Sequence, residues 1–220
     1  HTTPASGLVL PTMHELRENG MLAAKRVRLY DNLALGQANI GNLTTVEDWI
    51  TVDGTKKALT IFTHDAYGNV LTETDPNTHP TIYDYDAFNL YPETVTNALG
   101  HVTAYVYDYT SGQPKQVTDP NGEVRETDFD GLDRVVAERA PDPSLSTLTT
   151  TRTVSYVDTP NAGSVTETTF ILPGLAVDVV TYVDGFGRPI QRRARAEDEG
   201  CLPTYAASDT LYDGKGRVVQ

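Results

Sequence analysis

The chain has 220 residues and a formal net charge of -13. This charge disfavours binding to nucleic acid or anionic lipid, because both need clustered lysine and arginine, so we expect no nucleic-acid partner. Thr, Asp, Val and Tyr are abundant, and 17 Gly and 13 Pro are spread along the sequence, which predicts an all-β fold of strands and tight turns. No apolar run is long enough for a membrane span, so we expect none.

Residues 1–27 are rich in proline and polar side chains, and we interpret them as an N-terminal connector with one short helical turn at Met13–Glu18. Residues 28–64 are predicted to form lead-in β-hairpins. The spacing of Val46, Ile50 and Val52 places them on one face of a strand, and Asp53-Gly54 is predicted to turn the chain into a second strand over residues 58–62.

Residues 65–140 contain a regular repeat. An aspartate that follows an aromatic or apolar residue and precedes a turn recurs in steps of 21, 22 and 22 residues, at Asp65, Asp86, Asp108 and Asp130. A second turn marker keeps the same period, because Asp75-Pro76-Asn77 recurs 44 residues later as Asp119-Pro120-Asn121, with Asn97 in the slot between them. Two independent markers at one period indicate tandem repeats of about 22 residues.

Residues 141–220 are predicted to hold looser copies of the same repeat. Tyr156-Val157-Asp158 is followed by copies at Asp184 and Asp213, after steps of 26 and 29 residues. We expect the series to continue in a longer polypeptide, since the chain ends in mid-pattern at Val218-Val219-Gln220.

Each copy is typical of a β-hairpin. The aspartate can accept hydrogen bonds from backbone amides two and three residues on, and a glycine about three residues later supplies a positive φ. A period of 22 then leaves strands of roughly seven residues. The residues of this repeat signature are Tyr30, Asp31, Asp65, Gly68, Tyr85, Asp86, Tyr107, Asp108, Gly112, Phe129, Asp130, Asp184, Gly187, Arg188, Tyr212, Asp213, Gly216 and Arg217.

The aromatic residues before the aspartates have two interpretations. Hairpins stacked edge to edge would bring Tyr85, Tyr107 and Phe129 into register as a ladder on one sheet face. We interpret the ladder as structural packing, because function rarely needs every copy of a repeat; the alternative is sugar stacking or catalysis.

We find no catalytic, cofactor or metal motif. The histidines (His1, His14, His64, His79 and His101) lack metal-ligand spacing, and Cys201 has no Cys-x-x-Cys partner. The cluster Asp128, Asp130 and Asp133 could hold calcium but fails the EF-hand spacing, so capping of the turns explains it better. The basic run Arg192-Arg193-Ala194-Arg195 is followed by Glu197, Asp198 and Glu199, which favours a solvated strand end over a binding patch.

The Asp-x-x-Gly-Arg/Asn turns after tyrosine, with Thr-Asp-Pro-Asn-Gly between them, resemble YD/RHS repeats from roughly residue 28 to the end. The passage from Tyr30-Asp31-Asn32 to Glu47 is similar to the segment that leads into the repeats of toxin-complex B components and SpvB-type virulence proteins. Teneurins and polymorphic toxins have related repeats.

This resemblance implies that the repeats form a long, curved or spiralling antiparallel β-sheet, part of a hollow shell around a cytotoxic polypeptide. The expected partners are the remainder of the same or a partner shell protein, the enclosed toxin and a translocation-channel component, and the expected location is secreted or at the cell surface. We expect a structural scaffold and no enzyme. The alternatives are a cell-surface adhesion or carbohydrate-binding module and, third, a glycosidase or calcium-dependent hydrolase.

Overall fold

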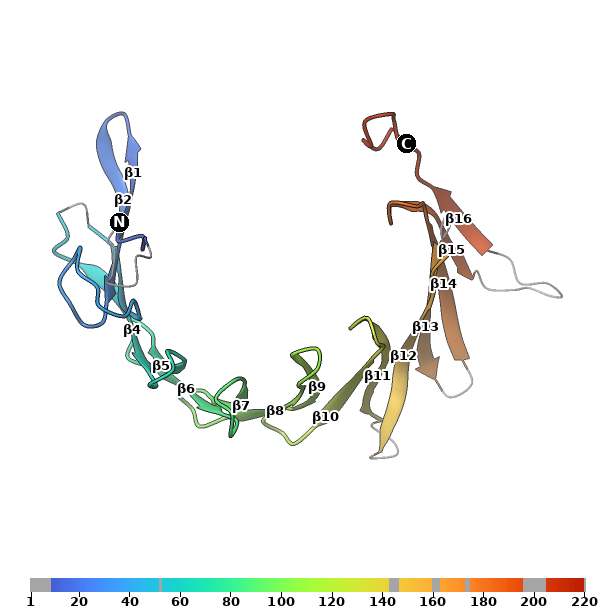
Figure 1. Cartoon of the computed structure of the whole chain (residues 1–220), viewed down its shortest axis with the longest axis horizontal. Helices are drawn as coiled ribbons and strands as arrows, with labels where there is room; N and C mark the ends of the chain where they lie inside the picture. Colours follow the sequence, from blue (N-terminus) through green and yellow to red (C-terminus); the bar gives the residue numbers. More distant parts are fainter. Residues whose placement is uncertain are drawn as a thin grey trace. The chain divides into compact units, whose positions relative to one another are not determined.

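The computed structural model describes residues 9–51, 53–142, 147–159, 163–172, 175–195 and 205–219. The regular structure in these ranges consists of antiparallel strands, and the strand order in the sheet is the order of the chain (Figure 1). The all-β prediction is therefore confirmed. The strands are β1 (Met13–Glu18), β2 (Met21–Tyr30), β3 (Leu43–Trp49), β4 (Lys57–His64), β5 (Val70–Thr74), β6 (Pro80–Tyr85), β7 (Pro92–Thr96), β8 (Val102–Asp108), β9 (Gln113–Thr118), β10 (Val124–Phe129), β11 (Val135–Pro141), β12 (Leu148–Val157), β13 (Gly163–Leu172), β14 (Leu175–Val183), β15 (Pro189–Arg195) and β16 (Tyr205–Asp209).

The chain divides into two compact units, His1–Tyr105 and Val106–Gln220. The division falls within β8 and therefore inside the stretch of regular repeats. The division differs from the predicted segments, which change at residues 28, 65 and 141 with the regularity of the repeat.

The predicted helical turn at Met13–Glu18 is wrong, because these residues form strand β1. β1 pairs with β2 in a hairpin whose turn holds Asn19 and Gly20, both with positive φ. A six-residue segment is too short to be stable as an isolated helix, and here pairing with β2 satisfies its backbone groups instead. The same hairpin shows that a strand begins inside the predicted connector.

The lead-in hairpin is confirmed, since β3 pairs with β4 from Thr45 opposite Ile61 to Trp49 opposite Lys57. Its connection is longer than a two-residue turn and is closed by the Gly54 amide donating to the Thr51 carbonyl at 3.0 Å. Ile50 lies beyond the strand and is exposed, contrary to the predicted apolar face, and Val52 falls outside the described residues. The Trp49 ring packs on Gly54, where a Cβ atom would lie 2.6 Å from it.

Bulges mark one edge of the sheet. The pairing register shifts at or just before the residue that precedes a signature aspartate, as between Thr63 and His64, Asp84 and Tyr85, and Asp128 and Phe129. The extra residue increases the local twist and re-aims the side chain that follows. The tyrosine and aspartate of each copy are therefore set at the rim of the sheet.

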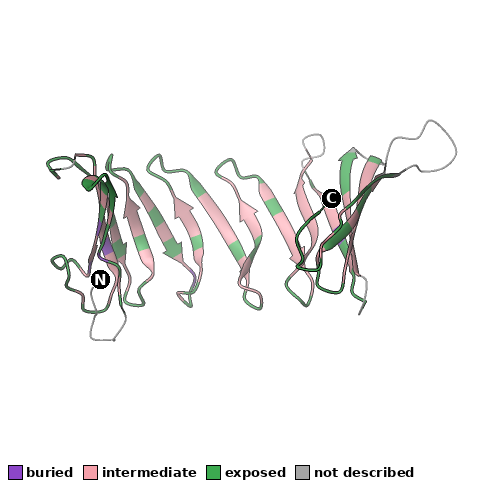
Figure 2. Ribbon diagram, turned by 90° about the horizontal axis from the view of Figure 1, so that it is seen from above, coloured by how far each residue is buried: buried purple, intermediate pink, exposed green. Residues whose placement is uncertain are grey.

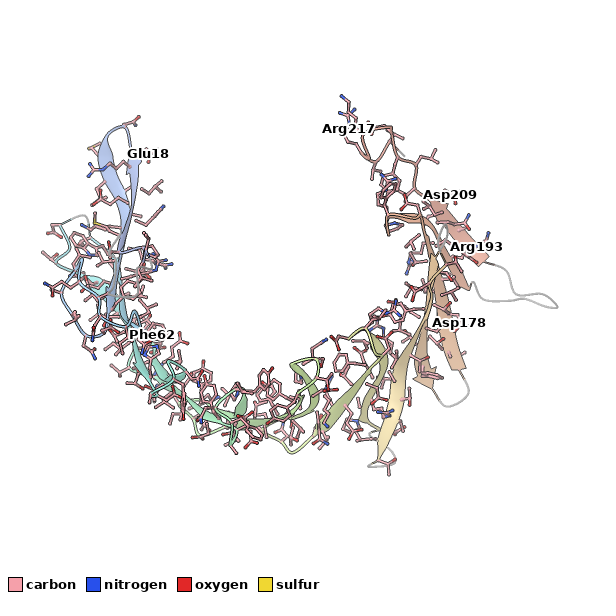
Figure 3. The ribbon with its side chains drawn as sticks, in the orientation of Figure 1. Glu18, Phe62, Asp178, Arg193, Asp209 and Arg217 are labelled. Carbon is pink, nitrogen blue, oxygen red and sulfur yellow. The ribbon has the colours of Figure 1, made fainter. Side chains whose placement is uncertain are left out.

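The sheet has little core of its own. Among the described residues, the buried apolar side chains are Val27, Tyr30 and Val154, and no side chain is fully buried. Most other strand residues are half-buried (Figure 2), with side chains extending from both faces of the sheet (Figure 3). Stability must therefore come from strand pairing, neighbouring side chains on each face, and the turns.

In the second unit, arginines link neighbouring strands. Arg139 on β11 contacts Asp128 and, at 3.6 Å, Glu126, both on β10. Arg152 on β12 contacts Glu138 at 3.3 Å and Glu167 at 2.7 Å, on the strands to either side. The arginine run lies at the end of β15, as expected for a strand end, and Arg193 donates to Gln191 at 2.6 Å. The acidic residues that follow it lie outside the described residues.

Candidate functional site: the repeated Tyr-Asp turns

The turn at Asp65 shows how the signature residues act locally. The Asp65 amide donates to the Asn69 carbonyl at 2.9 Å, and the Gly68 amide donates to the Asp65 carbonyl at 3.3 Å. The carboxylate Oδ1 of Asp65 accepts from the amides of Tyr67 at 2.8 Å and Asn69 at 2.9 Å. One aspartate thus holds a five-residue turn closed from inside.

The same pattern recurs at both edges of the sheet. On the tyrosine edge, the first residue of each turn accepts from the amides two and four positions on, at Asp65, Asp86, Asp130, Asp184 and Asp213. On the opposite edge the second turn marker does the same, at Asp75, Asn97 and Asp119.

The prediction that the aspartate accepts from the amide three residues on is wrong. In most turns that amide donates to the main-chain carbonyl of the aspartate, which leaves the amides at two and four positions for the side chain. The fourth residue reaches this geometry with a positive φ, at Gly68, Thr78, Asn89, Gly100, Gly122, Asp133, Gly187 and Gly216. Asp133, which we grouped with a calcium cluster, is therefore a turn residue.

Two copies depart from this geometry. At Asp108 the turn is wider, because the Gly112 amide donates to the Asp108 carbonyl at 2.7 Å and the carboxylate accepts from Thr110 at 2.8 Å. At Asp31 the connection runs to Asn42, and the carboxylate accepts from the four successive amides of residues 39–42 at 2.7–3.0 Å. The opening copy thus keeps its aspartate but encloses a longer loop.

These hydrogen bonds lower the pKa of the turn carboxyls. For Asp130 and Asp184 the main cause is the side-chain bond from the arginine four residues on, Arg134 or Arg188, and for Asp213 it is the backbone amide of Arg217. For Asp65 burial acts in the opposite direction, but the donors of Asn69 outweigh it and the pKa is still lowered. The turn aspartates therefore stay ionised as hydrogen-bond acceptors.

In three copies the tyrosine reaches back to the preceding strand. The hydroxyl of Tyr85 donates to the Val70 carbonyl at 3.1 Å, that of Tyr156 to Val135 at 3.1 Å, and that of Tyr212 to Pro189 at 2.9 Å. Each acceptor directly follows the preceding turn on the same edge. Tyr30 does likewise, donating to the Pro11 carbonyl at 2.8 Å. The phenol thus joins neighbouring copies, a role that Phe129 cannot share.

The residue after the fourth turn position also joins the copies, and the sequence did not reveal this role. The Asn69 side chain donates to its own Asp65 at 3.0 Å and to the main-chain carbonyl of Asn89, in the next turn, at 2.8 Å. Gln113 donates in the same way to the carbonyl of Asp133 at 2.9 Å. The only sequence signal was the recurrence of asparagine or arginine after the turn glycine.

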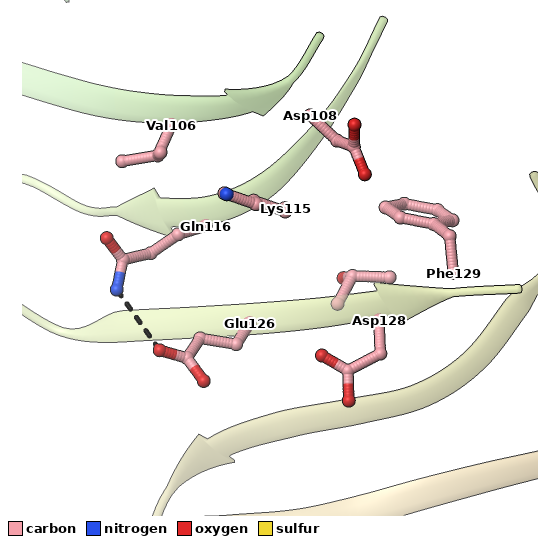
Figure 4. Close-up of a pocket in the computed structure, with 8 residues that line it drawn as sticks. Val106, Asp108, Lys115, Gln116, Glu126, Asp128 and Phe129 are labelled. Carbon is pink, nitrogen blue, oxygen red and sulfur yellow. Dashed lines mark hydrogen bonds between the residues drawn. The ribbon is translucent and has the colours of Figure 1, made fainter. Parts of the chain in front are cut away.

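The carboxylates that could suggest catalysis are engaged in protein contacts. A hollow of about 450 Å³ in the second unit is lined by Asp108, Glu126 and Asp128 (Figure 4). Glu126 accepts from the Gln116 side chain at 3.2 Å and Asp128 pairs with Arg139, which lowers the Asp128 pKa. Asp128 and Asp130 thus have different partners and do not converge on a common point as the calcium alternative requires.

The remaining candidates from the sequence are histidines and Cys201. His79 and His101 are exposed turn residues, beside Asp75 and Asn97, while His1 and Cys201 lie outside the described residues. Within the described ranges, no three His, Cys, Asp or Glu side chains are grouped so that they could hold a metal ion. No helix in these ranges is long and apolar enough to cross a membrane.

Comparison with known proteins agrees with this architecture. Residues 64–100 match the RHS Repeat family. The structure is similar to "Crystal Structure of TcdB2-TccC3", with a TM-score of 0.67 and 16% identity over 89% of this chain, and to "Crystal Structure of TcdB2-TccC3-TEV", with a TM-score of 0.62 and 13% identity over 90% of this chain.

This chain spans 14% and 16% of the length of those two structures. A comparison with curated proteins gives no sequence match. The matched segment, residues 64–100, contains the turns at Asp65, Asp75, Asp86 and Asn97 whose hydrogen bonds define the repeat. Residues 64–100 therefore match an RHS repeat, and the sheet has the fold of the TcdB2-TccC3 structures.

Proposed function

We propose that this chain is a structural wall segment of a secreted β-shell that encloses a toxin polypeptide, and that it is not an enzyme. The observation that carries the proposal is the fold similarity to TcdB2-TccC3 over 89% of the chain. Its partners would be further wall segments of the same kind, the enclosed polypeptide and a translocation channel.

The turn chemistry supports a wall function. The carboxylates of turns such as those at Asp65 and Asp130 are used as internal acceptors, and the tyrosine hydroxyls join neighbouring copies. A wall needs this kind of local, repeated closure, because each repeat contacts only its neighbours and stability grows by adding copies. Hydrolysis of a glycosidic bond would instead need two carboxylates that face one cleft.

Protease protection tests the proposal in the full-length protein that carries this chain. If the chain forms part of the shell wall, the enclosed polypeptide should resist added protease, and electron microscopy should show a closed shell. Asp86→Ala, which removes the acceptor for two amides of its turn, should make the enclosed polypeptide cleavable, whereas Asp133→Asn at an exposed turn residue should not. An open rod with an accessible polypeptide in the unaltered protein would contradict the proposal.

Two further measurements address the alternatives. A hydrolase screen of the purified chain should show no activity; activity that a single Asp→Asn change abolishes would establish an enzyme. A glycan array should show no binding; binding that Tyr107→Ala abolishes without loss of stability would establish an adhesion module.

A further inference from the structure

In the second unit, an arginine of one turn contacts the tyrosine of the next copy in the same way at two places. Arg134 holds its own Asp130 through Nε at 2.8 Å, and its guanidinium lies over the ring of Tyr156, from the next copy, at 4.0 Å. Arg188 holds its own Asp184 at 2.8 Å and lies over the ring of Tyr212 at 4.6 Å. In both cases the arginine is fixed by one turn and presented to the tyrosine of the next.

The tyrosine is held at two points. Its ring lies beneath the arginine, and its hydroxyl donates to the carbonyl of the residue that follows the arginine, Val135 or Pro189. The arginine and this carbonyl form what we call a tyrosine seat. Gly216 lies close to the same guanidinium, since a Cβ atom there would lie 2.9 Å from Nη1 of Arg188. Cation–π contacts of this kind are favourable, and the hydroxyl bond adds directionality.

Arg217 repeats the first half of this arrangement. It is held by Asp213 through Nε at 2.7 Å, as Arg134 and Arg188 are held by their aspartates. However, the Arg217 side chain is 72% exposed, against 30% for Arg134 and 36% for Arg188. No aromatic ring of the described residues lies over it; it extends from the turn that follows β16 (Figure 3).

We propose that Arg217 and the main-chain carbonyl of Val218 form a tyrosine seat for one further Tyr-Asp hairpin, which extends the sheet beside this turn. The occupant follows from continuity with the seats at Arg134 and Arg188, because the guanidinium is already oriented by its aspartate. Its tyrosine would stack on Arg217 and donate its hydroxyl to Val218. This inference concerns recognition between repeats and holds whether or not the sheet encloses a toxin.

The chain itself supplies the probe for a test. Val218-Val219-Gln220 aligns with Pro189-Ile190-Gln191, so a copy of residues 192–217 appended after Gln220 places the copied Tyr212 as many residues after Arg217 as Tyr212 lies after Arg188. The extended chain is compared with Arg217→Ala, with the copied tyrosine changed to alanine, and with both changes together, under reducing conditions. The unextended chain carries the same Arg217→Ala change as the matched control.

In the extended chain, each single change should speed hydrogen exchange in the appended hairpin about 2- to 5-fold, and the double change should add little to either. Changing the copied tyrosine to phenylalanine should preserve the stacking part of the effect. In the unextended chain, Arg217→Ala should loosen only its own turn, whereas Arg188→Ala should loosen the turn at Tyr212.

Additive effects of the two changes in the extended chain would overturn the proposal, since independent residues do not share a contact. An appended hairpin that exchanges like an unfolded tail in the unaltered extended chain would overturn it as well. In either case the shell proposal stands or falls separately on protease protection.

Discussion

Asp86 provides the sharpest test of the idea that turns hold this sheet together. The residue is only 3% exposed, and its carboxylate Oδ1 accepts from the amides of Phe88 at 3.0 Å and Leu90 at 2.9 Å. Asp86→Ala removes the acceptor from both donors. Both bonds are part-buried, and a hydrogen bond to a charged group contributes about 1.5–3 kcal/mol, so we expect the free energy of unfolding to fall by about 2–4 kcal/mol.

Asp86→Asn separates the hydrogen bonds from the charge. The amide oxygen can still accept from Phe88 and Leu90, so the expected loss is about 1 kcal/mol, the usual difference between a charged and a neutral acceptor. Asp133→Asn removes the same charge from an exposed turn residue whose positive φ suits asparagine, and it should change stability by less than about 0.5 kcal/mol.

Urea unfolding of the 220-residue chain, followed by circular dichroism, measures these differences, and hydrogen exchange shows whether the loss is centred on β6 and β7. Repeat proteins need not unfold in one step, so the local exchange rates are the primary readout. If Asp86→Ala is no more destabilising than Asp86→Asn, the acceptor role of the carboxylate does not stabilise the turn, and the reasoning is refuted.

Three further predictions follow from the turns. Tyr85→Phe removes the hydroxyl bond to Val70 and should lower the urea midpoint by an amount equivalent to about 1 kcal/mol, whereas Tyr67→Phe, at a side chain that is 76% exposed, should leave it unchanged. Thr78→Gly should raise stability by about 0.5–1 kcal/mol, because a β-branched residue at φ 66° is strained; a decrease in the midpoint would contradict this. The pKa of turn carboxyls such as Asp130 is lower in the folded chain than in the unfolded chain, so their ionised form stabilises the fold above the unfolded pKa. This stabilisation is lost as the pH falls through the folded pKa, and acid titration should therefore show unfolding below about pH 4. Asp130→Asn should reduce this pH dependence.

Much of the fold could be predicted from local sequence, because a β-hairpin depends on the residues of its own turn and arms. The position of each aspartate and of the glycine three residues after it identified the turns at Asp65, Asp184 and Asp213, and the structure places a closed turn at each. The lead-in hairpin was identified on the same grounds, since Asp53-Gly54 predicted a second strand over residues 58–62 and the structure has β4 there.

Features that depend on a neighbouring strand could not be predicted in this way. Met13–Glu18 consists mostly of residues that favour a helix, and pairing with β2 overrides this preference and makes it a strand. The register shifts before the signature aspartates arise from matching two arms across a bulge. Likewise, the amides that donate to a turn aspartate depend on which turn residue has the positive φ. The sequence predicted the amides two and three residues on, whereas the structure has those two and four residues on.

The sequence by itself determined that this chain is a tandem array of Tyr-Asp hairpins, because turn chemistry is encoded within five residues and repeats at a fixed spacing. Only the tertiary structure decided how one hairpin recognises the next. The contact of Arg188 with Tyr212 joins residues 24 positions apart. Their meeting depends on strand register, twist and the bulge between them, which no local pattern specifies.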